Sequence, residues 1–312
     1  MRLKHCASRR SFLTTTFASL FGLHGCQKSD YSPQDYEPKV LDSPSLKQTE
    51  YAFAVHPLHN PSRLFELFNP LMEYLNAHIP EARFRLEASR DYSSYDQKLA
   101  DASVEFALPN PYQTVTAIKS GHYRVFAKMG DDHNFRGIIL VRKDSGIRKV
   151  TDLKGKTISY PAPTALAATM MPQYYLYQHG LNIKTDVNNI YVGSQESSIM
   201  NVLHGESDAG ATWPPPWELL AQENPELKDK LEVKWQTDSL PNNGLIARSD
   251  VPQRLITQVQ RLLSEMHTTP QGREILQTIY LSRFEIADDA TYQPVKDFLE
   301  NFRQKIRIPE EE

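Results

Sequence analysis

Short apolar segments alternate with amphipathic helical patterns along the chain after residue 50. A compact run such as YAFAV is typical of a buried strand, whereas large apolar side chains three and four positions apart indicate a helix that covers a sheet. This alternation predicts an α/β fold with mixed or parallel sheets flanked by helices. The expected strands of the first unit are residues 51–55, 84–88 and 104–108, and its expected helices are 64–75, 92–100 and 112–120.

A second unit of the same kind begins after Gly155. Strand and helix patterns continue to residue 279, and Gly121, Gly180 and Gly205 stand where helices should stop. Ligands of such folds bind in the crevice outside the carboxyl ends of the strands. The expected strands are 157–160, 190–192, 209–212, 231–235 and 244–248, and the expected helices are 164–179, 195–204, 252–267 and 270–279.

The N-terminal residues 1–25 have the pattern of an export signal. Arg9-Arg10 precedes an apolar run at residues 14–23 that is too short to span a bilayer, and Cys26 follows a small residue. The arginine pair is typical of twin-arginine export, with general secretory export as the alternative. Cys26 stands at the bacterial lipidation position. We expect residues 26–49 to be a flexible tether, because they are rich in Pro and Ser.

Charge and cysteine content narrow the class of protein. Loss of the signal changes the formal net charge from −3 to −7 and removes Cys6, so the mature chain has only Cys26. No basic patch is present for nucleic acid, and no disulfide can form in the folded part. The expected location is the periplasm, with a lipid anchor in the inner or outer membrane.

Several stretches resemble one family in their order and spacing. Residues 141–147 and 152–157 are similar to the hinge and second-lobe entry of periplasmic solute-binding proteins of ABC importers. Residues 193–211, together with Asp91-Tyr92, resemble the phosphate/phosphite/phosphonate-binding branch with the type II fold. The resemblance implies two lobes joined by a two-segment hinge, with crossings near 148–150 and 239–242. Lobe 1 would comprise residues 50–148 and 240–312, and lobe 2 residues 149–239.

The resemblance also implies a ligand site between the lobes. Tyr92 matches the family's pocket tyrosine. Thr164 and Ala165 occupy the turn where phosphonate binders have Ser-Thr-Ser-Gly, and Thr164 is a candidate N-cap or ligand contact. Gln195 stands where relatives have His, and Asn243 lies in a pair that replaces an acidic element. Fewer donors face an anion here than in the family, so weak binding of simple alkylphosphonates is expected.

Further candidates come from loops at the expected cleft. Asn110 and Tyr112 can offer polar contacts, and Ser194 is either a ligand contact or an N-cap. Trp213 opens a Trp-Pro-Pro-Pro-Trp loop that either presents aromatic faces to a ligand or forms a packed corner. His56 and His59 could hold a metal only with further ligands, so a solvated loop is the preferred interpretation. The predicted ligand-binding set is Tyr92, Asn110, Tyr112, Thr164, Ala165, Ser194, Gln195, Trp213 and Asn243.

The sequence thus predicts a solute-binding protein that delivers a small, anionic, phosphonate- or phosphate-like ligand to an ABC permease and its ATPase. A sensory protein coupled to a membrane histidine kinase, for a ligand that need not be a phosphonate, is the alternative. The two share every feature of this chain, and neighbouring genes would distinguish them. The common nucleophile, zinc and phosphate-loop motifs of enzymes are absent. We therefore expect a monomeric non-enzyme with no cofactor, no metal and no nucleic-acid partner.

Overall fold

The computed structural model of this protein describes residues 48–310, which belong to one compact unit. The predicted signal peptide (1–25), Cys26 and nearly all of the predicted tether lie outside the described residues. The tether was expected to reach residue 49, but the first strand already begins at Thr49. Within the described residues, no helix is both long and apolar enough to cross a bilayer.

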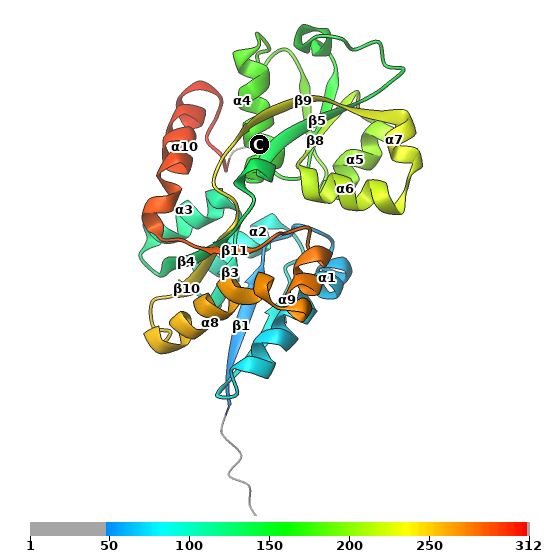
Figure 1. The fold of residues 1–312 in the computed structure, drawn as a ribbon. Helices are drawn as coiled ribbons and strands as arrows, with labels where there is room; N and C mark the ends of the chain where they lie inside the picture. The colour runs from blue at the N-terminus through cyan, green and yellow to red at the C-terminus, as the bar shows by residue number, and fades with distance from the viewer. Residues whose placement is uncertain (1–47, 311–312) are drawn as a thin grey trace, which may run out of the picture. The chain divides into compact units, whose positions relative to one another are not determined.

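The first sheet has six strands in the order β11-β4-β10-β3-β1-β2. β1 pairs in parallel with β2 and β3, whereas β10 and β11 run antiparallel to their neighbours. Figure 1 shows α1, α8 and α9 beside this sheet. The strands are β1 (Thr49–Val55), β2 (Ala82–Glu87), β3 (Phe106–Leu108), β4 (Tyr123–Met129), β10 (Gly244–Arg248) and β11 (Phe284–Ile286); the helices are α1 (Pro61–His78), α2 (Tyr92–Ala100), α3 (Pro111–Ser120), α8 (Gln253–Glu265), α9 (Pro270–Thr278) and α10 (Gln293–Lys305).

The second sheet has five strands in the order β7-β6-β8-β5-β9. β6 pairs in parallel with β7 and β8, and β5 is antiparallel to β8 and β9. The two mixed sheets flanked by helices confirm the predicted fold class. The strands are β5 (Arg136–Arg142), β6 (Thr157–Tyr160), β7 (Asn188–Tyr191), β8 (Ala209–Thr212) and β9 (Leu231–Ser239); the helices are α4 (Met171–Gln178), α5 (Gln195–His204), α6 (Pro214–Glu223) and α7 (Glu226–Lys230).

The chain passes between the sheets earlier than the sequence suggested. β5 is the fourth strand of the second sheet, so the first crossing lies at residues 130–135 and not near 148–150. The resemblance was read from the polar residues after β5, but the apolar run Gly137–Val141 already pairs with β8 and β9 and is buried. The second crossing joins β9 to β10 through residues 240–243. We call the parts built on the first and second sheets lobe 1 and lobe 2.

Local sequence fixes the helices that border the cleft. Asp91 begins α2 by accepting a hydrogen bond from the Ser94 amide at 2.8 Å, and Asn110 begins α3 with a reciprocal capping box. Pro111 occupies the first turn of α3, where its missing N–H costs no helical hydrogen bond. Gly121 ends α3 with a φ of +76°, a conformation that an L side chain rarely adopts. Both helices therefore start at the cleft edge of the first sheet.

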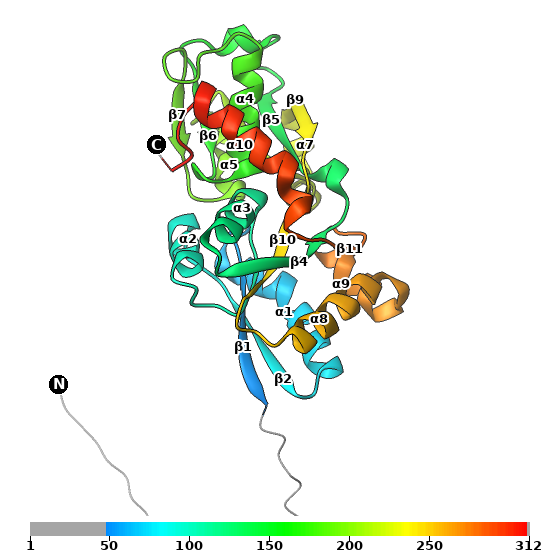
Figure 2. The ribbon, with the colours of Figure 1, turned by 90° about the vertical axis from the view of Figure 1, so that its left-hand side faces the viewer.

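The C-terminal helix packs on α3 of lobe 1 and also reaches lobe 2. Figure 2 shows α10 running beside α4, and the Phe298 and Tyr174 rings meet edge to face at 5.4 Å. After α10, Arg307 donates to the Gln173 side chain at 3.1 Å and to the Pro163 carbonyl at 2.9 Å. Arg307 thus contacts lobe 2, although the sequence analysis assigned residues 240–312 to lobe 1, whereas Glu310 contacts Tyr112 of lobe 1.

Candidate functional site

A small cavity, which we call the inner pocket, lies between the lobes at the carboxyl ends of the strands. Its volume is about 10 Å³, close to the minimum that a single water molecule needs. Six of the nine predicted ligand-binding residues line it, so the fold does bring most of that set together. The lining residues are His56, Tyr92, Asn110, Phe135, Ala165, Leu166, Ala167, Ala168, Gln195, Trp213 and Asn243.

The start of a helix in lobe 2 forms one wall of the inner pocket. A π-helical turn at Leu166–Met170 leads directly into α4. The first amides of a helix have no intrahelical acceptor and form the positive end of its dipole, so this wall favours an anion. The close approach of β5 requires glycine, because a Cβ on Gly137 would lie 2.5 Å from the Ala167 carbonyl oxygen.

Thr164 does not cap this helix, contrary to one interpretation of its sequence position. Ala165 is the residue before the π-helical turn, and no side chain caps it. The Thr164 hydroxyl instead donates to Asp96 Oδ2 in α2 of lobe 1 at 3.3 Å. Thr164 lies outside the inner pocket and lines another cavity described below.

Side-chain amides hold the lobes together around the inner pocket. Asn110 Nδ2 donates to the Thr164 carbonyl at 3.1 Å, and Gln195 Nε2 donates to the Tyr92 hydroxyl at 3.4 Å. The orientation of the Gln195 amide is set by Thr212, whose hydroxyl donates to Gln195 Oε1 at 2.8 Å. Four predicted site residues, in two pairs, therefore form contacts between the lobes in this closed arrangement.

Asn243 carries a polar atom with no partner. Its side chain is fully buried, Nδ2 lies 3.4 Å from the Met129 sulfur, and Oδ1 has no hydrogen-bond partner. A thioether is a weak acceptor, and leaving a buried polar atom unpaired costs about 1–3 kcal/mol. Asn243 is also the last residue of the second crossing, next to β10. A ligand group that donates a hydrogen bond to Oδ1 would remove the penalty.

His56 is a lining residue that the sequence analysis placed only at the cleft edge. Its Nδ1 lies 2.9 Å from the Leu108 carbonyl, which can only accept, so Nδ1 carries the proton and Nε2 is an acceptor in the neutral ring. Burial is the main cause that lowers the pKa of His56 to about 4, the Leu108 hydrogen bond opposes it, and His59 lowers it further. The ring is therefore neutral at pH 7.

The solvated-loop interpretation of the two histidines is wrong. His56 and His59 are 3% and 6% exposed, and His59 Nδ1 lies 2.8 Å from Glu196 Oε1 of lobe 2. Burial disfavours the charged form of Glu196, but the hydrogen bond and charge of His59 prevail and hold the pKa of Glu196 below its usual value. Among the described residues, no three His, Cys, Asp or Glu side chains are arranged to hold a metal ion.

The Trp-Pro-Pro-Pro-Trp segment is the start of a helix and not a loop. Trp213 is the N-cap of α6, and the three prolines occupy its first turn, where amide donors would have no helical acceptor. Trp213 is 3% exposed, lines the inner pocket and lies 5.5 Å from the Phe135 ring centre. Trp217 is buried in the core of lobe 2 with Ile138 and Leu140, so for that ring the packed-corner interpretation is correct.

Ser194 and Tyr112 lie outside the inner pocket. The Ser194 hydroxyl accepts from the Ser197 amide at 3.0 Å, which makes it the N-cap of α5. Tyr112 donates its hydroxyl to Glu310, near the C-terminus. Neither position lines the inner pocket in this structure.

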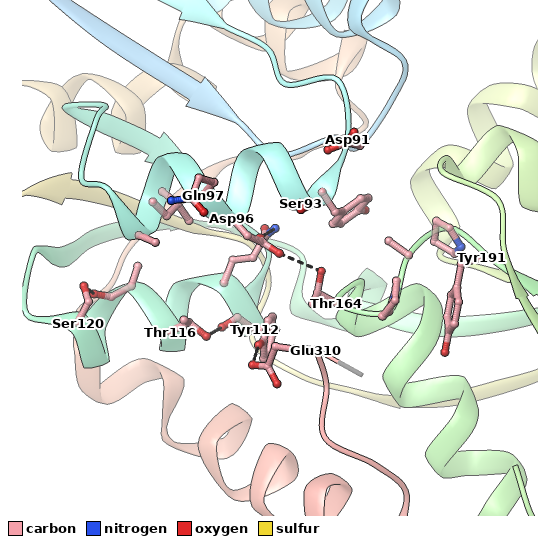
Figure 3. A pocket seen from close by; sticks show the side chains of 18 of the residues that line it. Asp91, Ser93, Asp96, Gln97, Tyr112, Thr116, Ser120, Thr164, Tyr191 and Glu310 are labelled. Atoms are coloured by element: carbon pink, nitrogen blue, oxygen red, sulfur yellow. Dashed lines mark hydrogen bonds between the residues drawn. The ribbon is translucent and has the colours of Figure 1, made fainter. Parts of the chain in front are cut away.

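A much larger cavity, the α2–α3 groove, lies next to the inner pocket. Its volume is about 750 Å³, and the Tyr92 side chain borders both cavities. Figure 3 shows Asp96 and Thr164 facing each other at its centre, with Tyr112 and Glu310 below them. The lining residues are Asp91, Tyr92, Ser93, Asp96, Gln97, Leu99, Ala100, Tyr112, Gln113, Thr116, Ala117, Ser120, His122, Pro161, Ala162, Pro163, Thr164, Tyr191, Gly193 and Glu310.

The fold and the site between two lobes define the class of protein as a type II periplasmic binding protein. Solved structures agree with this fold. PhnD1 from Prochlorococcus marinus in complex with methylphosphonate has a TM-score of 0.75 at 19% identity and covers 82% of this chain and 99% of that one. A binding protein component of an ABC phosphonate transporter from Pseudomonas aeruginosa has a TM-score of 0.73 at 18% identity, with 82% and 87% covered.

Sequence comparison gives the family. The family described as ABC transporter, phosphonate, periplasmic substrate-binding protein matches residues 53–292, and the chain belongs to this family. A probable ABC transporter phosphite binding protein of Prochlorococcus marinus is 23% identical over 186 residues, which are 55% of this chain and 63% of that protein. The phosphonates-binding periplasmic protein of Escherichia coli is 19% identical over 213 residues, which are 66% of this chain and 63% of that protein. This chain thus spans about 63% of the length of these two relatives.

Proposed function

We propose that this chain is the exported, lipid-anchored solute-binding component of an ABC importer. In this proposal it captures a small ligand with an anionic, phosphonate- or phosphate-like head group in the inner pocket. Family membership supports the transport role, and the N-terminal residues 1–26 support export and lipidation. The permease and its ATPase are the proposed partners. Delivery to them requires that the lobes separate and close again about the hinge.

The observation that carries the ligand proposal is the buried polar lining of the inner pocket. The helix start at Leu166 brings the positive end of its dipole to the space that Asn243 also lines. Asn243 Nδ2, which has only a weak thioether acceptor, can donate to an anionic oxygen, whereas its unpartnered Oδ1 can only accept. Neutral His56 adds no charge there. An anion held by amides and neutral side chains needs no Lys or Arg, and none lines this pocket.

The closed pocket also constrains affinity. Its volume of about 10 Å³ leaves no room for a phosphonate unless the lobes move apart. Pro163, Gln195 and Asn243 stand where the family resemblance implies other donors. Each absent hydrogen bond to a charged oxygen costs about 1.5–3 kcal/mol, so we expect simple alkylphosphonates to bind weakly.

Calorimetry on the chain without its first 26 residues tests this proposal. The ligands are methylphosphonate, ethylphosphonate, phosphite and phosphate, none of which carries an ammonium group. We expect at least one to bind at micromolar or weaker affinity, and Asn243→Ala to abolish that binding. Asn301→Ala, on the exposed face of α10, is the matched control and should bind like the wild type.

Two outcomes would contradict different parts of the proposal. Absence of binding to all four anions, or unchanged binding in Asn243→Ala, would reject the inner pocket as an oxyanion site. Submicromolar affinity for a simple alkylphosphonate would instead show that the helix amides suffice, and that the donor count is a poor guide to affinity.

A further inference from the structure

The α2–α3 groove differs from the inner pocket in size and position. With about 750 Å³ it is within the range of small-molecule sites, whereas the inner pocket holds about one water molecule. Most of its lining comes from α2 and α3 of lobe 1, and it continues along α3 as far as Ser120 and His122. Lobe 2 contributes residues 161–164, together with Tyr191 and Gly193. The groove therefore extends well beyond the strand ends that define the inner pocket.

Its charge is opposite to that expected for an anion site. Among the described residues, the lining includes the carboxylates of Asp91, Asp96 and Glu310 and no Lys or Arg. Asp91 is paired with Arg90 at 2.8 Å, and Glu310 accepts a hydrogen bond from Tyr112. A negatively charged ligand would be repelled here.

Asp96 is the carboxylate at the centre of the groove, and it has no cationic partner. Gln113 Nε2 donates to Asp96 Oδ1 at 2.6 Å and the Thr164 hydroxyl donates to Oδ2 at 3.3 Å, both neutral groups. Throughout residues 48–310, no Lys, Arg or His nitrogen lies within ion-pair distance of it. A half-buried carboxylate without a counter-charge is unfavourable, so a cation bound beside Asp96 would stabilise it. The cavity is large enough to hold one.

The walls around Asp96 suit an aliphatic chain. Leu99, Ala100 and Ala117 provide apolar surface along α2 and α3. Hydroxyl oxygens of Ser93 and Thr116 line the same space and can accept hydrogen bonds. A primary ammonium has three donors and no acceptor, which suits a cavity lined by a carboxylate and by hydroxyl oxygens. Its alkyl chain would lie along the apolar wall.

We propose that the α2–α3 groove binds an aliphatic primary amine, with the ammonium group on Asp96 and the alkyl chain along Leu99 and Ala117. This site is separate from the inner pocket and does not depend on the anionic ligand. Binding at Asp96 would also add a counter-charge next to its contact with Thr164, the hydroxyl contributed by lobe 2.

Affinity for the amine should depend on pH. Burial, the main cause, raises the pKa of Asp96 to about 6; the hydrogen bonds from Gln113 and Thr164 oppose it, and Glu310 and Asp91 raise it further. An ammonium binds the ionised carboxylate, so affinity should fall as the pH drops through 6. The other titratable groups around Asp96 are Asp91, Glu310, His122, Tyr92, Tyr95 and Tyr112. Hydrogen bonds from Ser94 lower the pKa of Asp91 to about 2. Burial raises the pKa values of the three tyrosines.

Calorimetry at pH 7.5 tests this proposal with 1-aminobutane and 1,4-diaminobutane, and with 1-butanol and butyrate as uncharged and anionic controls. We expect the amines to bind and the controls not to bind. Asp96→Asn should weaken amine binding at least about tenfold, since it removes a charged acceptor. Asp101→Asn removes one charge from the exposed C-terminal end of α2 and should have no effect.

Asn243→Ala separates this proposal from the proposed function. We expect it to keep full amine affinity, because Asn243 lines only the inner pocket. The proposal is overturned if neither amine binds at millimolar concentration, if butanol binds equally well, if Asp96→Asn binds like the wild type, or if Asn243→Ala abolishes amine binding. Failure of the four phosphorus anions to bind would leave this result unaffected.

Discussion

Replacing Asp96 with Asn should stabilise the protein at neutral pH. The pKa of this carboxyl rises from 3.8 to about 6 on folding. At about 1.36 kcal/mol per pH unit, the ionised form costs the folded state up to about 3 kcal/mol at pH 7.5. Screening by water at a half-buried site reduces this value, so we expect a gain of about 1–2 kcal/mol. An Asn side chain can keep the contacts with Gln113 and Thr164.

The gain should vanish in acid. Between pH 3.8 and about 6 the folded state binds more protons at Asp96 than the unfolded state, so this carboxyl lowers the unfolding free energy as the pH rises. His56 acts in the opposite direction, since its pKa falls from 6.5 to about 4 on folding and its contribution to stability is lost as the pH drops between these values. The two effects offset each other in the wild type. Only the difference between variant and wild type isolates Asp96.

Urea unfolding at pH 4, 5, 6 and 7.5 measures this difference. Wild type, Asp96→Asn and the control Asp101→Asn are compared at each pH, with unchanged m values as evidence of a common unfolding transition. The stabilisation of Asp96→Asn should grow from near zero at pH 4 to its full value by pH 7.5. A destabilised variant at pH 7.5, or a difference that does not change with pH, would refute the assignment of Asp96 as an unpaired, desolvated carboxylate.

Four further predictions concern packing, export and motion. Trp213→Ala should cost about 3–5 kcal/mol of unfolding free energy, because the buried ring borders a cavity of only about 10 Å³; a loss below about 1 kcal/mol in urea would contradict this packing. Cys26→Ala should release the mature protein from the membrane fraction, and unchanged fractionation would reject the lipid anchor. The double replacement Arg9→Lys and Arg10→Lys should block export by the twin-arginine route, whereas normal export of this variant would indicate the general secretory route. Small-angle scattering should give a smaller radius of gyration with saturating ligand, and superposable curves would argue against lobe closure.

The sequence predicted the fold well because its signals are local. The helix at residues 92–100 and the helix that ends before Gly121 follow from caps and periodicity, and both appear at the expected positions. The position of the first crossing between the sheets, in contrast, depends on contacts between distant segments. Whether an apolar strand joins one sheet or the other depends on pairing with distant strands, here β8 and β9, and no local pattern around residues 136–142 reports it.

The sequence predicted which residues lie at the candidate site better than it predicted their contacts. Loops that follow strands meet at one edge of each sheet, which is why Tyr92, Gln195 and Asn243 come together. The bond from Thr164 to Asp96 joins residues 68 positions apart and could not be read from spacing. Asp96 looked like an ordinary helix-surface residue, since nothing in the sequence shows that its carboxyl faces lobe 2.

Tyr92 connects the inner pocket with the α2–α3 groove, because it is the one described residue that lines both. Its hydroxyl also accepts the Gln195 hydrogen bond from lobe 2, so a ligand that rotates this side chain from either cavity would disturb a contact between the lobes. By thermodynamic linkage, a factor by which amine in the groove changes the affinity for the anion must equal the factor by which bound anion changes the affinity for the amine. That factor is one if the Tyr92 side chain stays in place.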